Sequence, residues 1–188
     1  ENSAMAEEKQ VLFAGFGGQG VISMGQFLTH LAMHTGKEVS CALSYGAEMR
    51  GGTANCLVTI SDEEISSPLT ENPMTAVIMN RPSLDRFEDK VKPRGTLVLN
   101  SSMVDRLPRR NDVEVLQMPV NMIADQLGTP RVANMVLLGA FVEKQQLLDI
   151  DQALEFLEVV FKGKKESVIT KNKEAFLIGV EYARKHWK

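Results

Sequence analysis

The chain lacks the residues that an iron–sulfur or zinc centre would need. Its 188 residues include two cysteines, Cys41 and Cys56, and three histidines, and no C-x-x-C pair occurs. A four-thiolate cluster therefore cannot be built by this polypeptide alone. Because both cysteines lie in apolar runs, two small buried side chains are favoured over a disulfide. No metal site is expected.

Long hydrophobic runs and basic stripes are also missing. The longest nearly apolar run, Val132–Val142, includes Asn134 and is far too short to cross a bilayer. The chain opens on polar and acidic residues, unlike a secretory signal, so a cytoplasmic location is expected. With a net charge of -3 and no basic stripe interleaved with aromatic residues, neither nucleic acid nor membrane is expected as a partner.

What remains is an ordinary globular composition, with 44% hydrophobic and 24% charged residues. Residues 1–9 are expected to form a disordered terminus, of which Glu1–Ala4 is left from cloning ahead of a native Met5. Residues 10–188 are expected to form one α/β domain, because strand patterns alternate with helix patterns. We predict a Rossmann-like, mostly parallel sheet with flanking helices.

Two local expectations accompany this fold. A short hairpin-like insertion is predicted near 54–66, where strand Ala54–Ile60 would pair with a short strand at Ile65–Ser66. Further along, Thr129 is predicted to cap the amino terminus of a helix that starts at Pro130 and continues through Val142. That helix is apolar on almost every side, as buried or interface helices are.

The first candidate site follows the strand Val11–Ala14. Gly15, Gly17 and Gly20 have the G-x-G-x-x-G spacing, Gly18 is a fourth glycine, and a helical pattern follows. Such a turn leaves backbone N–H groups at the positive end of a helix, where a phosphate or another anion can bind. The same spacing also occurs where glycines serve only to pack a strand against a helix.

The second candidate site is the loop Ser44–Gly52, after the strand Val39–Leu43. If these two strands are neighbours in a parallel sheet, their loops share one crevice. The two loops would then offer side chains with hydrogen-bonding or charged groups beside bare glycine backbone: Gln19, Tyr45, Glu48, Arg50, Gly51 and Gly52. Arg50 suits a phosphate, although it could equally be a surface cation paired with Glu48.

A dinucleotide site is disfavoured by the second strand. Binding of the ribose hydroxyls of NAD requires an acidic residue at the end of that strand. The strand ends in Ser44 and Tyr45, whereas Glu38 precedes it and Glu48 lies in the following loop. A free-standing NAD(P)-binding oxidoreductase is therefore a less favoured alternative. A non-catalytic scaffold whose glycine loop only packs is a further alternative.

Three motifs together resemble a known family. The glycine loop, the segment 44–55 and the stretch Val132–Ala140, which contains Asn134, are similar in order and spacing to the gamma subunit of 2-oxoacid:ferredoxin oxidoreductases. The resemblance covers nearly the whole chain, from about Gln10 to its end. The tyrosine in the second motif resembles the 2-oxoglutarate and branched-chain (ketoisovalerate) members more closely than the indolepyruvate members.

The resemblance implies a multi-subunit enzyme that converts a 2-oxoacid, coenzyme A (CoA) and oxidised ferredoxin into an acyl-CoA, CO₂ and reduced ferredoxin. It implies alpha, beta and ferredoxin-like partner subunits that hold thiamine diphosphate, Mg²⁺ and iron–sulfur clusters, with ferredoxin as the electron acceptor. This chain would bind CoA and assist assembly, would contain no catalytic residue, and would be inactive alone. The residues expected at the CoA site are Gly15, Gly17, Gly18, Gln19, Gly20, Tyr45, Glu48, Arg50, Gly51, Gly52 and Asn134.

Overall fold

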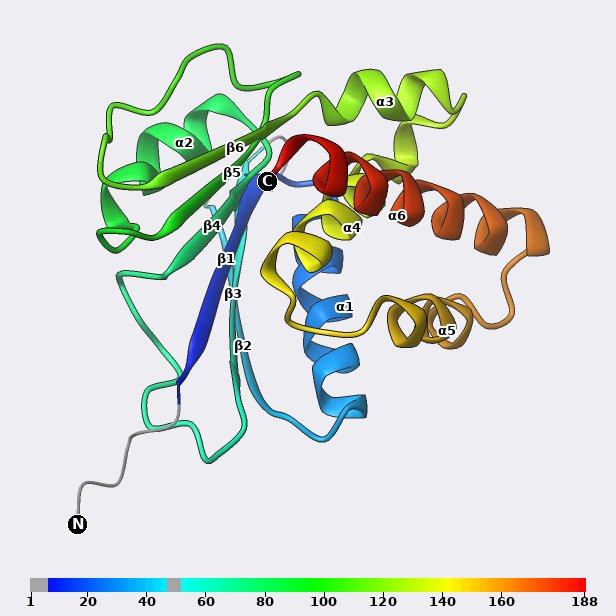
Figure 1. The fold of residues 1–188 in the computed structure, drawn as a ribbon, viewed down its shortest axis with the longest axis horizontal. Coiled ribbons are helices and arrows are strands. Elements are labelled where there is room, and N and C mark those ends of the chain that lie inside the picture. Colours follow the sequence, from blue (N-terminus) through cyan, green and yellow to red (C-terminus); the bar gives the residue numbers. More distant parts are fainter. Residues whose placement is uncertain (1–6, 47–51) are drawn as a thin grey trace. The chain divides into compact units, whose positions relative to one another are not determined.

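The computed structural model of the chain describes residues 7–46 and 52–188. In this part of the chain, helices separate β1 from β2 and β4 from β5, whereas no helix lies between β2, β3 and β4 or between β5 and β6 (Figure 1). The elements are β1 (Lys9–Phe16), α1 (Val21–His34), β2 (Glu38–Tyr45), β3 (Thr53–Ser61), β4 (Thr75–Ile78), α2 (Arg81–Phe87), the 3₁₀ helix η1 (Glu88–Lys90), β5 (Thr96–Asn100), β6 (Glu114–Met118), α3 (Val120–Gln126), the 3₁₀ helix η2 (Pro130–Val132), α4 (Ala133–Gln145), α5 (Ile150–Val160) and α6 (Glu166–His186).

The strands form one six-stranded sheet in the order β2-β3-β1-β4-β5-β6. β1 pairs parallel with β4, whereas β3 runs antiparallel to both β1 and β2. The predicted fold class, a single α/β domain with a mixed, mostly parallel sheet and flanking helices, is therefore confirmed.

The departure from strict alternation has a different form from the one expected. β3 pairs with the preceding strand β2, and Ile65–Ser66 contains no strand. β1 and β2 are consequently not neighbours, because β3 lies between them. The reason is that an antiparallel pair of strands needs only a short connection, so β3 can return along β2 without a helical crossover.

Helix α1 covers one side of β1, β2 and β3, and α2 lies on the opposite side of the sheet (Figure 1). Close packing of α1 depends on Gly25, because a Cβ atom there would lie 2.9 Å from the Cβ of Cys56. The odd-numbered side chains of β1, such as Phe13, share this side with Cys56, its partner in the register. Gly36, with φ 83°, directly follows Thr35, the C-cap of α1.

Two compact units, interleaved in sequence, make up the chain. The first contains residues 1–97 and 106–115, and the second contains residues 98–105 and 116–188. Within the second unit, α4 and α6 cross at two glycines, Gly139 and Gly179. A Cβ atom at Gly139 would overlap the backbone carbonyl of Phe176, and one at Gly179 would overlap that of Val136.

The start of α4 differs from the prediction. Residues Pro130–Val132 form the 3₁₀ helix η2, and the side chain of Thr129 makes no capping hydrogen bond. The backbone N–H of Val132 donates instead to the carbonyl of Thr129.

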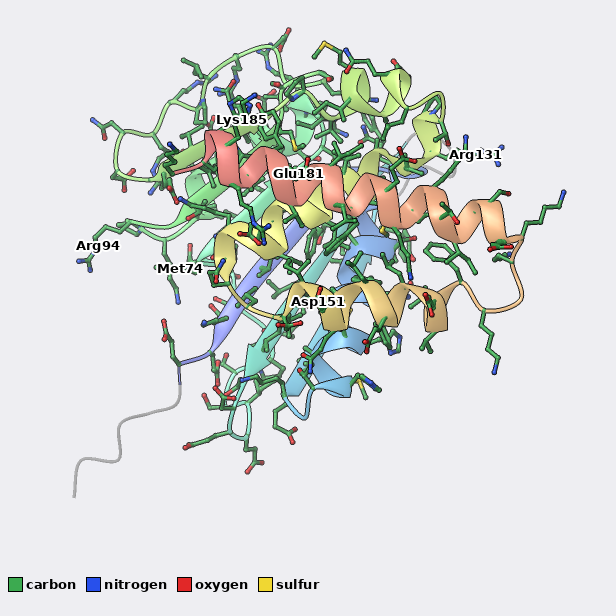
Figure 2. All side chains as sticks on the ribbon, turned by 45° about the vertical axis from the view of Figure 1, so that its right-hand side comes forward. Met74, Arg94, Arg131, Asp151, Glu181 and Lys185 are labelled. Carbon is green, nitrogen blue, oxygen red and sulfur yellow. The ribbon has the colours of Figure 1, made fainter. Side chains whose placement is uncertain are left out.

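On α6, Glu181 and Lys185 project from the outer surface of the helix (Figure 2). Within the described ranges, no helix has the length and apolar character needed to cross a membrane.

Candidate anion site at the glycine loop

The glycine loop presents bare backbone between β1 and α1. Gly17 and Gly18 are exposed, and Gly20 is the N-cap of α1 with no side chain to cap the helix. Gly18 and Gly20 have φ values of 92° and 77°, a region that residues with a Cβ atom rarely adopt. Since the first turn of α1 contains no acidic residue, its N–H groups and positive dipole end are available to an anion.

Gly15 has a packing role in the same loop. A Cβ atom at Gly15 would lie 2.7 Å from Oε1 of Gln19 and 2.9 Å from the Cβ of Met79. Any larger residue at position 15 would displace Gln19. The motif therefore uses its glycines for two purposes, close packing at Gly15 and left-handed backbone at Gly18 and Gly20.

The side chain of Gln19 holds the loop together. Its Oε1 accepts hydrogen bonds from the backbone N–H of Phe16 at 2.7 Å and from Nδ2 of Asn80 at 3.0 Å. Its Nε2 donates to the carbonyl of Met79 at 3.3 Å. The carboxamide of Gln19 thus links the loop after β1 to the loop after β4, and its proposed contact with a ligand stays a prediction.

Asn80 is a site residue that the sequence reasoning missed. It is almost completely buried, and its Oδ1 accepts a hydrogen bond from the backbone N–H of Ser83 at 2.9 Å as the N-cap of α2. An asparagine directly before Arg81-Pro82 is a recognisable helix-start pattern. That pattern could have located Asn80 at a carboxyl-end loop of the sheet.

The two predicted loops approach one another although their strands are not neighbours. Ala54 of β3 pairs with Gly15 on one side and with Tyr45 on the other, so β1 and β2 end at the same level of the sheet. The backbone N–H of Gly17 donates to the carbonyl of Gly52 at 2.9 Å. The structure therefore brings the glycine loop and the end of the second loop together.

The remaining predicted residues lie in different places. Tyr45 is at the end of β2 with 68% of its surface exposed. Glu48, Arg50 and Gly51 lie outside the described residues. Asn134 belongs to the second unit, in the first turn of α4, and its part in a common site stays a prediction.

The two cysteines are free thiols on β2 and β3, with their Sγ atoms 3.2 Å apart. Burial, together with the hydrogen bond to Cys41, holds the pKa of the Cys56 thiol far above its usual value, so this thiol stays protonated at neutral pH. The described residues contain no group of three or more His, Cys, Asp or Glu side chains placed to hold a metal ion.

Comparison with known proteins assigns the chain to a family. Residues 10–182 match the model for the pyruvate ferredoxin/flavodoxin oxidoreductase family. The chain is 38% identical over 180 residues to the ketoisovalerate oxidoreductase subunit VorA of Methanothermobacter thermautotrophicus, covering 95% of this chain and 37% of VorA. It is 34% identical over 181 residues to the 2-oxoglutarate synthase subunit KorC of Methanocaldococcus jannaschii, covering 94% of each.

Solved structures show the same fold. The gamma subunit of a keto/oxoacid ferredoxin oxidoreductase from Geobacter sulfurreducens superposes with a TM-score of 0.79 at 27% identity, covering 94% of this chain and 99% of that one. A 2-oxoglutarate:ferredoxin oxidoreductase from Magnetococcus marinus, with 2-oxoglutarate, CoA and succinyl-CoA bound, superposes with a TM-score of 0.88 at 28% identity. The similarity covers 95% of this chain and 31% of the Magnetococcus chain.

The chain thus spans about a third of the VorA and Magnetococcus chains and nearly the full length of KorC and of the Geobacter gamma subunit. The chain belongs to the pyruvate ferredoxin/flavodoxin oxidoreductase family, among the gamma subunits and gamma-type domains of the 2-oxoacid:ferredoxin oxidoreductases.

Proposed function

We propose that this chain is the gamma component of a complex that converts a 2-oxoacid, CoA and oxidised ferredoxin into an acyl-CoA, CO₂ and reduced ferredoxin. Its contribution is to bind CoA and to assist assembly. Thiamine diphosphate, Mg²⁺ and the iron–sulfur clusters belong to alpha, beta and ferredoxin-like partner subunits. Two free cysteines, one of them buried, are consistent with this division because cluster ligation requires more thiolates.

The observation that carries the CoA proposal is the amino terminus of α1, which has no side-chain cap hydrogen bond and lies beside the exposed Gly17 and Gly18. These glycines offer backbone to a phosphate without a Cβ atom in the way, and nothing lies within 4 Å of a Cβ atom built at Gly18. The hydrogen bond from the backbone N–H of Gly17 to the carbonyl of Gly52 places Gly52 beside this loop. Arg50 would add a guanidinium that binds phosphate through two hydrogen bonds.

Support also comes from the Magnetococcus relative, whose complex contains CoA and succinyl-CoA. When bound here, CoA would supply the thiol that accepts the acyl group. The residues of this chain would hold its phosphates through the backbone of Gly17, Gly18 and Gly20. The likeness to VorA and KorC favours a 2-oxoglutarate or branched-chain 2-oxoacid as the substrate of the complex.

The test is calorimetry with CoA on the assembled complex, using Gly18→Val and Arg50→Ala. Gly163→Val is the matched control, because Gly163 also has a positive φ, 85°, with no atom within 4 Å of a Cβ atom built there. We expect both loop variants to weaken CoA binding by at least about tenfold, the loss of roughly one charge-assisted hydrogen bond. Unchanged affinity in both would remove CoA from this loop.

A scaffold function is the second candidate, because the carboxamide of Gln19 is used within the loop itself. A scaffold would co-purify with partner chains that contain iron–sulfur clusters, yet Gly18→Val would leave CoA turnover of the complex unchanged. A loss of turnover together with weaker CoA binding would favour the CoA proposal over the scaffold. Titration with NAD and NADP tests the free-standing dehydrogenase, which predicts micromolar binding.

A further inference from the structure

A groove lies on the side of the sheet that faces away from α1. It has a volume of about 320 Å³ and is bounded by β1, β2 and β3, by α2 with η1, and by the loop before β4. The floor is apolar, because Leu12, Leu57 and Ala42 lie side by side on adjacent strands in the register. A volume at the lower end of the ligand-site range suits one small organic molecule.

Two cations stand at one wall of this groove. The guanidinium carbon of Arg86 lies 5.0 Å from the centre of the Phe87 ring, and Nζ of Lys90 lies 5.8 Å from it. Neither cation forms a salt bridge with a carboxylate in residues 7–46 or 52–188. Two unpaired cations beside one ring favour an anion with more than one oxygen, such as a phosphate.

Polar groups without partners complete the lining. The hydroxyl of Ser44 and the carboxamide of Asn55 lie one step further toward the carboxyl edge, on neighbouring positions of β2 and β3. Glu71 supplies a carboxylate from the loop before β4. None of these three side chains makes a hydrogen bond to another residue in the described ranges.

We propose that this groove binds a phosphorylated nucleoside. The phosphate would contact Arg86 and Lys90, and the flat apolar base would lie on Leu12, Leu57 and Ala42. Glu71 would accept hydrogen bonds from the ribose hydroxyls, which is the interaction that an acidic residue makes in dinucleotide sites. Asn55 and Ser44 would bind the polar edge of the base.

This combination favours a nucleoside phosphate over simpler ligands. Inorganic phosphate would leave the apolar floor and Asn55 unused. A fatty or other purely aliphatic anion would offer Glu71 and Asn55 no hydrogen-bond partner. The proposal does not depend on CoA binding at the glycine loop, because no residue from 15 to 20 lines the groove.

The experiment is equilibrium dialysis of the purified full chain with AMP, adenosine and inorganic phosphate as separate probes. We expect saturable AMP binding, with adenosine and phosphate each at least about tenfold weaker, because each retains only part of the contacts. Arg86→Ala combined with Lys90→Ala should weaken AMP at least about tenfold. The matched control removes two exposed lysines of the second unit, Lys162→Ala with Lys164→Ala.

Glu71→Gln tests the ribose contact. It should weaken AMP several-fold and leave 2′,3′-dideoxy-AMP unchanged, because the dideoxy analogue lacks the hydroxyls that Glu71 would bind. Absence of saturable AMP binding would overturn the proposal. So would an equal loss in the lysine control, which would indicate attraction by overall charge. AMP binding that is lost in Gly18→Val but kept in the Arg86/Lys90 variant would also overturn it, by placing the ligand at the glycine loop.

Discussion

The carboxamide of Gln19 is hydrogen-bonded to the carboxamide of Asn80, which lies 61 residues further along the chain. Asn80 in turn caps α2 through its Oδ1. One pair of amides therefore fixes the glycine loop after β1 to the start of the helix after β4. Because Asn80 is almost completely buried, replacing Gln19 by an apolar residue would leave the buried Nδ2 of Asn80 without this hydrogen bond.

The first prediction concerns Gln19. Gln19→Leu removes the acceptor for the Phe16 N–H and for Asn80, together with the donor to the Met79 carbonyl. We expect the free energy of unfolding to fall by about 1–3 kcal/mol, the cost of leaving such groups unpaired. Urea denaturation followed by circular dichroism measures this. Gln152→Leu, on the exposed part of α5, should stay within about 0.5 kcal/mol of the parent, and an equal loss there would contradict the assignment.

The second prediction concerns the crossing of α4 and α6. A Cβ atom at Gly139 or Gly179 would overlap backbone of the facing helix, and backbone cannot rotate away as a side chain can. Gly139→Ala and Gly179→Ala should therefore each destabilise the protein by roughly 1–3 kcal/mol, the usual cost of overpacking. Thermal unfolding monitored by circular dichroism is the measurement.

Lys185→Ala is the control for these glycine variants, because Lys185 lies on the outer surface of α6 (Figure 2). An alanine at position 179 that leaves the melting temperature unchanged would mean that the two helices do not cross at this glycine.

The third prediction is a pH dependence that originates at Glu88. Burial by itself would raise the pKa of this carboxyl group, but hydrogen bonds from the Arg106 guanidinium and the Arg109 N–H outweigh it and hold the pKa below its usual value. The unfolded-state pKa of a glutamate is about 4.3. The stabilisation from Glu88 is therefore complete above about pH 5 and is lost as the pH falls through the lowered native pKa.

Glu88→Gln should accordingly flatten the decline in unfolding free energy between about pH 5 and pH 3, and it should also lower stability at pH 7. Glu158→Gln is the matched control, because Glu158 is exposed in its pair with Lys173 and contributes little. If the unfolding free energy of Glu88→Gln declined as steeply below about pH 5 as that of the parent, carboxylates other than Glu88 would be responsible for the decline.

The fourth prediction concerns the start of α5. Oδ1 of Asp149 accepts a hydrogen bond from the backbone N–H of Gln152 at 3.0 Å, as an N-cap residue does. Asp149→Ala should lower the free energy of unfolding by about 1 kcal/mol, whereas Asp149→Asn should retain most of it. Equal losses for the two variants, measured by urea denaturation, would exclude the capping hydrogen bond as the cause.

Local sequence signals predicted several features well because neighbouring residues alone produce them. The apolar run before Gly15 and the helical pattern after Gly20 gave β1 and α1, since both depend on short periodicities. The three family motifs led to the correct family for a similar reason, since each depends on glycines at fixed local positions. Their glycines are needed for backbone geometry at Gly18 and Gly20 and for close helix packing at Gly139.

The position of β3 could not be obtained in this way. The pattern at Ala54–Ile60 indicates a strand, but the partner of that strand is set by tertiary contacts and not by the local pattern. The predicted pairing with Ile65–Ser66 is wrong, because β3 pairs with β2 and β1 instead. The roles of Asn80 and Glu88 were missed for the same reason. Each acquires its partner from a segment distant in the chain, Gln19 in one case and Arg106 in the other.

The sequence by itself determined the α/β fold class, the glycine loop and the family, because hydrophobic periodicity and glycine spacing act over a few residues. Only the tertiary structure decided that β3 separates β1 and β2, that Gln19 is held by Asn80, and that a groove opens beside Arg86 and Lys90. These features depend on contacts between segments far apart in the chain, where burial and hydrogen-bond satisfaction select among arrangements that local patterns leave equally possible.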